Sequence, residues 1–311
     1  MGRILTWTGR TVAYLFYGLA VALFLLWYLF PEKTVRRWLE CRMGQMTPEM
    51  EWRFERIGFA LPPAVALDNI RISSGRGQEQ PLILDRLALF PDVAVLVRTR
   101  RPAARYRLQC CGGRVEGAWS LSGEGEIDCT GTVSNLHLEG LRPLFVDLNR
   151  QLDGILSGTF ALHGEAQSLL QGKGRMNLVL SDGRMTFQAP VLGMNELPYS
   201  RITMQATLED KAMRIEQGTV ESKQLQANFS GSVELAVPWL NSQVRLEGAM
   251  QPRPEFFGTL GNPQGVELIR RQLKDGRLTF TVSGRLAEPG ILFAGIPASL
   301  NTMLQGGRKQ P

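Results

Sequence analysis

Apolar and polar residues alternate along most of this chain, and the alternation begins near residue 50. In MEWRFER the apolar residues are Met50, Trp52 and Phe54, and charged residues stand between them. RITMQATL, at 201–208, repeats the pattern with uncharged polar residues. Strict alternation places the apolar side chains on one face of a β-strand and does not fit the helical period. The sequence therefore predicts a mostly β protein with about a dozen antiparallel strands between residues 49 and 295.

A short sequence motif that begins with Asp-Gly occurs three times, at 153–164, 182–187 and 275–286. Asp-Gly between alternating runs predicts a β-hairpin, because a type I′ turn needs positive φ at both central residues. Two later glycines, Gly158 and Gly284, suit a bend or a bulge. A long sheet with one apolar face must curl into a groove or pack against a second sheet, as in a sandwich. The predicted apolar groove lining comprises Leu156, Phe160, Leu162, Leu178, Leu180, Phe187, Phe229, Leu278 and Phe280.

Helical periodicity is rare after residue 50, and we predict only two or three short helices there. Segments 142–152 and 265–274 space their apolar residues at helical intervals, and 297–305 does so more weakly. The first of these helices could separate two lobes of the β-rich domain, near residues 141–152. Residues 296–311 are expected to form a C-terminal tail.

Residues 11–30 read TVAYLFYGLAVALFLLWYLF and contain no charge. Twenty helical residues span roughly 30 Å, the thickness of the hydrocarbon layer of a bilayer. The run is too long for a cleaved signal peptide and lacks an Ala-x-Ala site, so it predicts a single uncleaved transmembrane helix. Residues 1–10 would precede it on the cytoplasmic side, and 31–48 would follow as a juxtamembrane helix lying on the membrane. The flanking arginines and lysines favour a cytoplasmic domain, but long domains often cross despite such flanks, so they leave the orientation open.

No catalytic or cofactor-binding motif is visible. The chain has two histidines and four cysteines, without the spacing that zinc sites need. Gly-x-Ser-x-Gly is absent, and the glycines of QGKGRMN run into a strand rather than a helix, so neither a hydrolase nor a phosphate site is indicated. His163 lies in an alternating run and is more readily a sheet residue than a ligand. We predict no enzyme activity, no cofactor and no metal site.

The net charge is +6, and five arginines gather in VRTRRPAARYR. They could bind anionic lipid headgroups or an acidic partner, but the pattern favours a simpler interpretation, a solvated hairpin tip around Pro102. Nucleic-acid binding is disfavoured, because stacking aromatic residues are not interleaved with the arginines. The cluster comprises Arg98, Arg100, Arg101, Arg105 and Arg107.

Three of the four cysteines lie close enough in the sequence to pair across neighbouring strands. Cys110 or Cys111 could form a disulfide with Cys129 if the domain is periplasmic. Buried free thiols are an equally good interpretation, and the sequence does not separate the two.

Several segments resemble the GspN family, the N component of type II secretion systems. They are YLFPEKTVRRWLECRMGQMT after the apolar run, RIGFALPPAVALDNIRIS, and CCGGRVEGAWSL with its Gly-Gly hairpin. LDGILSGTFALHG and the residues after it resemble the hairpins that this family shares with AsmA-type proteins. The resemblance covers about residues 10–295. The pair Cys110–Cys111 is not part of the pattern.

The resemblance implies a single-pass protein of the bacterial inner membrane with its bulk in the periplasm. It implies a non-enzymatic part in protein export across the outer membrane, with other type II secretion subunits and inner-membrane lipids as partners. The AsmA-like hairpins imply a second candidate function, a lipid-binding or lipid-transfer module. No catalytic residue carries over from the family.

Overall fold

The computed structural model describes residues 14, 17–18, 21, 31–46, 50–60, 64–74, 81–144, 152–165, 171–236, 239–259 and 263–296. Fourteen strands form one sheet in this part of the chain. The strands are β1 (Met50–Ala60), β2 (Ala64–Ser74), β3 (Leu82–Pro91), β4 (Ala103–Cys110), β5 (Gly113–Leu121), β6 (Glu126–His137), β7 (Leu152–Glu165), β8 (Lys173–Val191), β9 (Met194–Glu209), β10 (Ala212–Glu221), β11 (Leu225–Glu234), β12 (Gln243–Pro252), β13 (Leu278–Arg285) and β14 (Glu288–Phe293). The helices are α2 (Glu32–Met46), α3 (Val93–Thr99), α4 (Pro254–Thr259) and α5 (Pro263–Gln272), and the 3₁₀ turns are η1 (Leu138–Leu144) and η3 (Trp239–Asn241).

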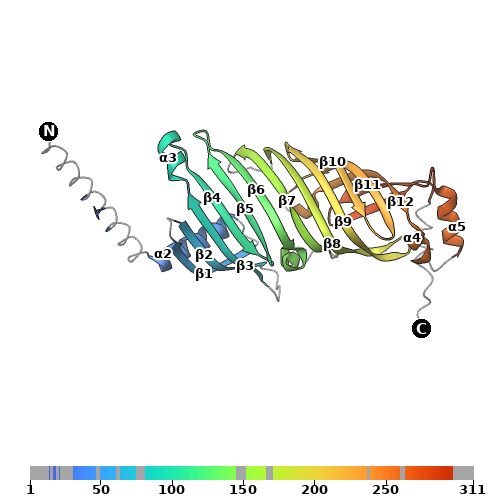
Figure 1. The fold of residues 1–311 in the computed structure, drawn as a ribbon, viewed down its shortest axis with the longest axis horizontal. Helices are drawn as coiled ribbons and strands as arrows, with labels where there is room; N and C mark the ends of the chain where they lie inside the picture. Colours follow the sequence, from blue (N-terminus) through green and yellow to red (C-terminus); the bar gives the residue numbers. More distant parts are fainter. Residues whose placement is uncertain are drawn as a thin grey trace, which may run out of the picture.

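The strand order in the sheet is the order in the sequence, from β1 to β14, and each neighbouring pair is antiparallel. Figure 1 shows the result, a long twisted ribbon whose strands cross its long axis obliquely. The predicted antiparallel sheet is confirmed, and the sandwich alternative is wrong, because the described strands form one sheet and not two. The sheet is also continuous across the connection between β6 and β7, which pair from Glu126↔Glu165 to His137↔Ile155.

Only one of the three Asp-Gly motifs makes a two-residue turn. Asp275 and Gly276 both have positive φ, and this turn joins α5 to β13. Asp182 also has a positive φ, 51°, but it lies inside the continuous strand β8. The hairpin predicted at that position is therefore wrong: β8 continues through it and pairs with β9 on both sides. Asp or Gly with positive φ occurs in β-bulges as well as in turns. Here the strand pairs on both sides of Asp182 show that the residue lies in an irregular strand and not in a turn.

The tight hairpin turns lie at other dipeptides. Cys111 and Gly112 have φ of 50° and 69° and join β4 to β5 as a two-residue turn. Asp210 and Lys211 join β9 to β10 in the same way. These positive values at both central residues are those of a type I′ turn, which matches the twist of antiparallel strands.

The helices agree in part with the prediction. α5 confirms the helix at 265–274. Of the helix predicted at 142–152, residues up to Leu144 form the 3₁₀ turn η1, and 145–151 lie outside the described residues, as does 297–305. The sequence prediction missed α3 and α4. The apolar run at 11–30 falls almost entirely outside the described residues, and none of the helices that are described is both long and apolar enough to cross a bilayer.

The juxtamembrane helix exists as α2, but its apolar side faces the protein. Val35, Leu39 and Met43 pack against the buried residues of β1, β2 and β3. The sheet therefore covers this side of α2, and the expectation that the helix lies on the membrane stays a prediction.

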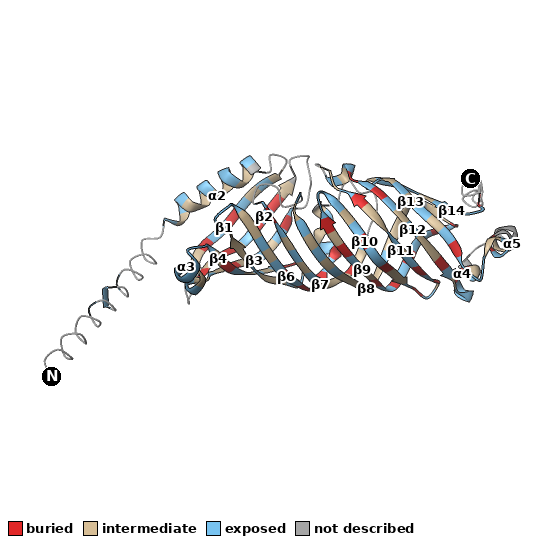
Figure 2. Ribbon diagram, turned by 90° about the horizontal axis from the view of Figure 1, so that it is seen from above, coloured by how far each residue is buried: buried red, intermediate tan, exposed pale blue. Residues whose placement is uncertain are grey.

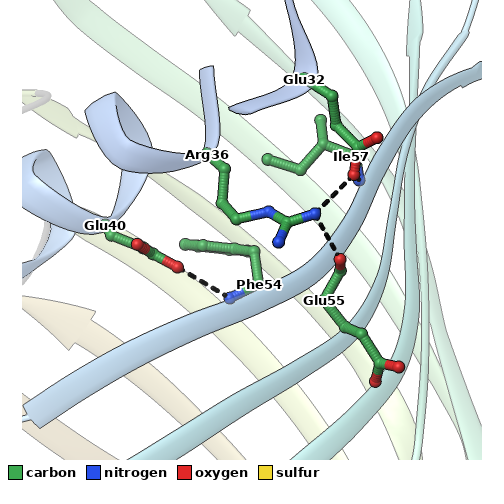
Figure 3. A network of polar contacts seen from close by, with 6 residues as sticks. All are labelled: Glu32, Arg36, Glu40, Phe54, Glu55 and Ile57. Atoms are coloured by element: carbon green, nitrogen blue, oxygen red, sulfur yellow. Dashed lines mark hydrogen bonds and ion pairs between the residues drawn. The ribbon is translucent and has the colours of Figure 1, made fainter. Parts of the chain in front are cut away.

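Polar side chains of α2 also reach the outer edge of β1 (Figure 3). Arg36 Nη2 donates to Glu32 Oε1 and to the carbonyl of Glu55, each at 2.6 Å. The amides of Ile57 and Phe54 donate over 3.4 Å to Glu32 and Glu40. An edge strand otherwise offers unpaired backbone groups to other chains. α2 thus shields the first edge of the sheet, and we call these contacts the edge clasp.

Candidate apolar binding face

The strand register brings the apolar residues of all the strands onto one side of the sheet. Phe160 of β7 faces Gly131 of β6 and Met176 of β8, which in turn faces Ala206 of β9. Similar rows run across the rest of the sheet, and Phe229 in β11 faces Gly248 in β12. We call this side the apolar face. All nine residues that the sequence predicts as groove lining belong to it: Leu156, Phe160, Leu162, Leu178, Leu180, Phe187, Phe229, Leu278 and Phe280.

The two ends of the apolar face are closed by helices. At the first end, α2 covers a buried cluster that includes Phe54, Ile57 and Ile70. At the other end, Phe256 of α4 and Ile269 of α5 are fully buried against β9, β11, β12 and β13. Leu278 belongs to this closed end, and Phe187 and Phe280 pack against it.

The middle of the apolar face is much less covered. β5 contains no buried residue, and only two glycines are buried in β7. Phe160, Leu162, Leu178 and Leu180 are half-buried in the described structure. Figure 2 shows tan and blue positions along these central strands, with red positions both among them and toward the ends. A row of large apolar side chains in an open sheet is an unusual surface for an isolated soluble protein, which makes it a candidate binding site.

Aromatic rings on this face lie over glycines of neighbouring strands. A Cβ built on Gly131 would meet Phe160 Cζ and Tyr106 Oη, both at 2.5 Å. Gly218 stands in the same relation to Phe229, and Gly248 to Phe280. The missing side chain lets each ring approach the backbone of the neighbouring strand closely.

Tyr106 belongs to the apolar face although the sequence analysis did not select it. Its hydroxyl donates to the carbonyl of Thr130 at 3.0 Å, and burial raises its pKa. Tyr199 similarly donates to the carbonyl of Asp153, and burial, with the charges of Asp153 and Glu139, raises its pKa to about 12. Both hydroxyls stay protonated and paired at neutral pH, so they add no charge to this side of the sheet. The alternation ARYRLQC carries the signal for Tyr106, because its flanking arginines point outward.

The opposite side of the sheet is polar and carries ion pairs between strands. Arg107 Nε lies 2.6 Å from Glu116 Oε1, and Lys173 Nζ lies 3.4 Å from Glu209 Oε1. His163 is on this side, with Nδ1 at 2.7 Å from Asp128 Oδ1. Half of its side chain is exposed, as a sheet residue of the polar side would be. The described residues contain no cluster of three His, Cys, Asp or Glu side chains that could hold a metal ion.

The cysteines are not arranged for the disulfide considered above. All four are free. Cys129 faces Trp119, which faces Ala104, whereas Cys110 lies six positions further along β4. At about 3.3 Å per residue this separates the two rows by roughly 20 Å, far beyond the reach of a disulfide. Cys111 is in the turn beyond Cys110. The alternative of free thiols fits this placement, and burial raises the pKa of Cys110 to about 12.

The arginine cluster spans two elements. Arg98 belongs to α3, Arg100 ends it in a left-handed conformation, and Arg101 follows, while Arg105 and Arg107 point outward from β4. Arg107 is paired with Glu116 and stacks 6.0 Å from the ring centroid of Phe90. The structure therefore splits the predicted cluster, and it turns the expected hairpin tip into a short helix.

No known family model, curated protein or solved structure matches this chain.

Proposed function

We propose that this protein is a non-enzymatic module of the bacterial cell envelope that holds acyl chains along its apolar face. The observation that carries the proposal is the half-buried middle of that face, where Phe160, Leu178 and Leu180 stand in neighbouring strands with no α-helix of the described structure packed over them. Covering this surface would gain roughly 25 cal/mol for each Å² of apolar area removed from water. Acyl chains suit it because they are unbranched, apolar and long enough to cross several strands.

The two closed ends support the same proposal. α2 at one end and α4 with α5 at the other leave the central strands as the part of the apolar face where a ligand finds half-exposed residues. Glycines beneath Phe160 and Tyr106 leave room for both rings on this part of the face. An apolar surface without charged groups favours acyl chains over polar headgroups, and the headgroups would stay in water at the strand ends.

The experiment compares lipid bound to the full chain and to paired variants after purification in a mild detergent. Phe160→Asp places a carboxylate on the apolar face, and Thr159→Asp places one on the exposed polar side of the same strand. We expect about tenfold less co-purified phospholipid or fatty acid with Phe160→Asp, because an unpaired charge would be buried under the ligand. Thr159→Asp should retain the wild-type amount.

This pairing controls for lipid that surrounds the predicted membrane helix, since both variants keep residues 11–30 unchanged. Equal lipid in both variants, measured by mass spectrometry of the extracts, would show that the apolar face holds none and would reject the proposal. Phe280→Asp, beside the closed end, is expected to lose lipid less completely.

The second candidate is a structural or assembly component of the type II secretion system, with the bulk of the chain in the periplasm and residues 11–30 in the inner membrane. It is supported by the resemblance of the segments quoted above, which fall on β1–β2 and on the β4–β5 hairpin. Its specific consequence is that deletion lowers export of folded substrates and that crosslinks from the polar side reach other subunits. Protease added to spheroplasts should digest the domain. A domain that resists protease until the inner membrane is broken would face the cytoplasm, against this candidate.

A further inference from the structure

α3 is a short helix that touches β4 but leaves one apolar side uncovered by the described part of the protein. It contains seven residues, none of them buried. Val93, Leu96 and Val97 are 54%, 47% and 73% exposed. Their spacing of three and four residues places them on one side of the helix, the arrangement by which a helix normally meets a core. Here that apolar side faces outward.

Local contacts nevertheless hold α3 in a defined shape. The side chain of Asp92 accepts the amide of Val95 at 3.1 Å, and the amide of Arg100 donates to Leu96 O at 2.9 Å. At the base, Asp92 N donates to Ala103 O at 2.8 Å. α3 is therefore capped at both ends and fixed to the sheet, so its exposed valines and leucine keep a defined arrangement on the protein surface.

Apart from the N-capping Asp92, the charged side chains of α3 and of the residues that follow it are arginines. Arg98, Arg100, Arg101 and Arg105 have no carboxylate within ion-pair distance in the described part of the chain, whereas Arg107 is paired with Glu116. The first turn of α3 contains no acidic residue. Exposed apolar residues beside unneutralised arginines match an anionic bilayer surface, which offers phosphate groups above hydrocarbon.

The position in the fold is also suitable. Figures 1 and 2 both place α3 and the beginning of α2 at the same end of the long axis. Glu32 opens α2 directly after the apolar run at 11–30, so the predicted membrane helix would hold this end of the sheet at the bilayer. We propose that α3 is a second membrane contact, in which Val93, Leu96 and Val97 enter the interface of an anionic bilayer and Arg98, Arg100 and Arg101 bind lipid phosphates. The proposal rests on the predicted anchor but not on acyl-chain binding by the apolar face.

The test uses the full chain in lipid nanodiscs and measures hydrogen–deuterium exchange of the peptide that covers residues 93–101. Discs of phosphatidylcholine alone are compared with discs that also contain phosphatidylglycerol. We expect about tenfold slower exchange in the anionic discs, because each arginine near an anionic surface adds several-fold to its affinity. The loop at 122–125, between β5 and β6, contains Glu124 and no arginine, and its exchange should be the same in both discs.

Two substitutions separate the parts of the contact. Val97→Asp should remove the slowing through loss of the apolar insertion, and Arg98→Glu with Arg101→Glu should remove its dependence on phosphatidylglycerol. Because these side chains are exposed, the fold should persist, and lipid bound to the apolar face should be unchanged. Lys211→Glu with Lys223→Glu, at the exposed turns on either side of β10, reverses the same number of charges away from α3 and should leave the slowing intact.

Exchange at 93–101 that is equal in the two kinds of disc would overturn the proposal, as would a chain that does not enter the discs. Slowing that appears without lipid and grows with protein concentration would assign α3 to a contact between two copies of the chain, and would overturn it too.

Discussion

At the scale of single residues, glycines decide how the rings of the apolar face lie. Gly131 leaves room for both Phe160 and Tyr106, and a methyl group would overlap each of them at 2.5 Å. Gly58, in β1, has no atom within 4 Å of the same position. The two glycines therefore form a matched pair, alike in secondary structure and different in surroundings.

We expect Gly131→Ala to destabilise the protein by about 1–3 kcal/mol, because the rings must move off their rotamers or the strands must separate. Gly58→Ala should be neutral or slightly stabilising, since alanine suits a strand better than glycine does. Thermal unfolding of both variants in the same detergent measures the difference. Equal melting temperatures would mean that the rings move aside without cost.

The buried thiols supply a second prediction at this scale. Burial, with a contribution from Cys111, raises the pKa of Cys110 to about 12, so very little of it is thiolate at pH 8. Since the thiolate is the nucleophile, iodoacetamide should modify exposed Cys41 fully while Cys110 stays unmodified until the protein unfolds. Mass spectrometry of the labelled peptides measures both. Protection of Cys110 that is abolished by a reductant would instead indicate a disulfide.

At the scale of elements, the edge clasp links α2 to β1 through Glu32 and Arg36. The hydrogen bond from Arg36, then that from the Ile57 amide, lowers the pKa of Glu32 below its ordinary value of 4.5. A lowered folded-state pKa stabilises the clasp above pH 4.5, and this contribution disappears as the pH falls through the folded value. The pair is more than one-third exposed on average, which limits its strength.

We therefore expect Glu32→Gln to cost at most about 1 kcal/mol at pH 7, or about 1–3 °C in melting temperature. The difference from the wild type should shrink below pH 4.5 and vanish once Glu32 is protonated in both states. Melting curves across this range measure it, and Glu51→Gln, in β1 but outside the clasp, is the control. A difference that persists in acid would show that the charge of Glu32 is not its source.

The elements also show how far the sequence leads. Strict alternation located the strands well, because every strand has one apolar and one polar side. The Asp-Gly rule failed at Asp182, since positive φ at that residue satisfies a bulge as well as a turn and only the paired strands decide between them. α3 was missed because seven residues are too few for a helical period to stand out, and its apolar side has no core to which it could be matched. The common face of the nine predicted residues followed from alternation, whereas Tyr106 and the glycines beneath the rings became visible only with the register.

At the scale of the whole molecule, each strand contacts the strands that precede and follow it, so stability is local along the ribbon. β9 buries residues from Met194 to Leu208, whereas β5 buries none. A ligand on the central strands would add the cover that they lack and would stabilise them by mass action.

We expect backbone amides of β5 to β7 to exchange faster in delipidated protein than in protein reloaded with phosphatidylglycerol, while those of β9 to β12 change little. Hydrogen–deuterium exchange of the full chain with and without lipid measures this. Uniform slowing along all strands would indicate general stabilisation by the detergent–lipid mixture, and no change at β5 to β7 would contradict an occupied apolar face.

The order of the strands has a consequence for how such a protein can evolve. Because neighbours in the sheet are neighbours in the sequence, one hairpin can be gained or lost by a single in-frame duplication or deletion without rerouting any connection. Each event would change the length of the apolar face by two strand widths, about 10 Å, and would leave the helices at both ends in place. Selection could thus change the length of the sheet in steps of one hairpin.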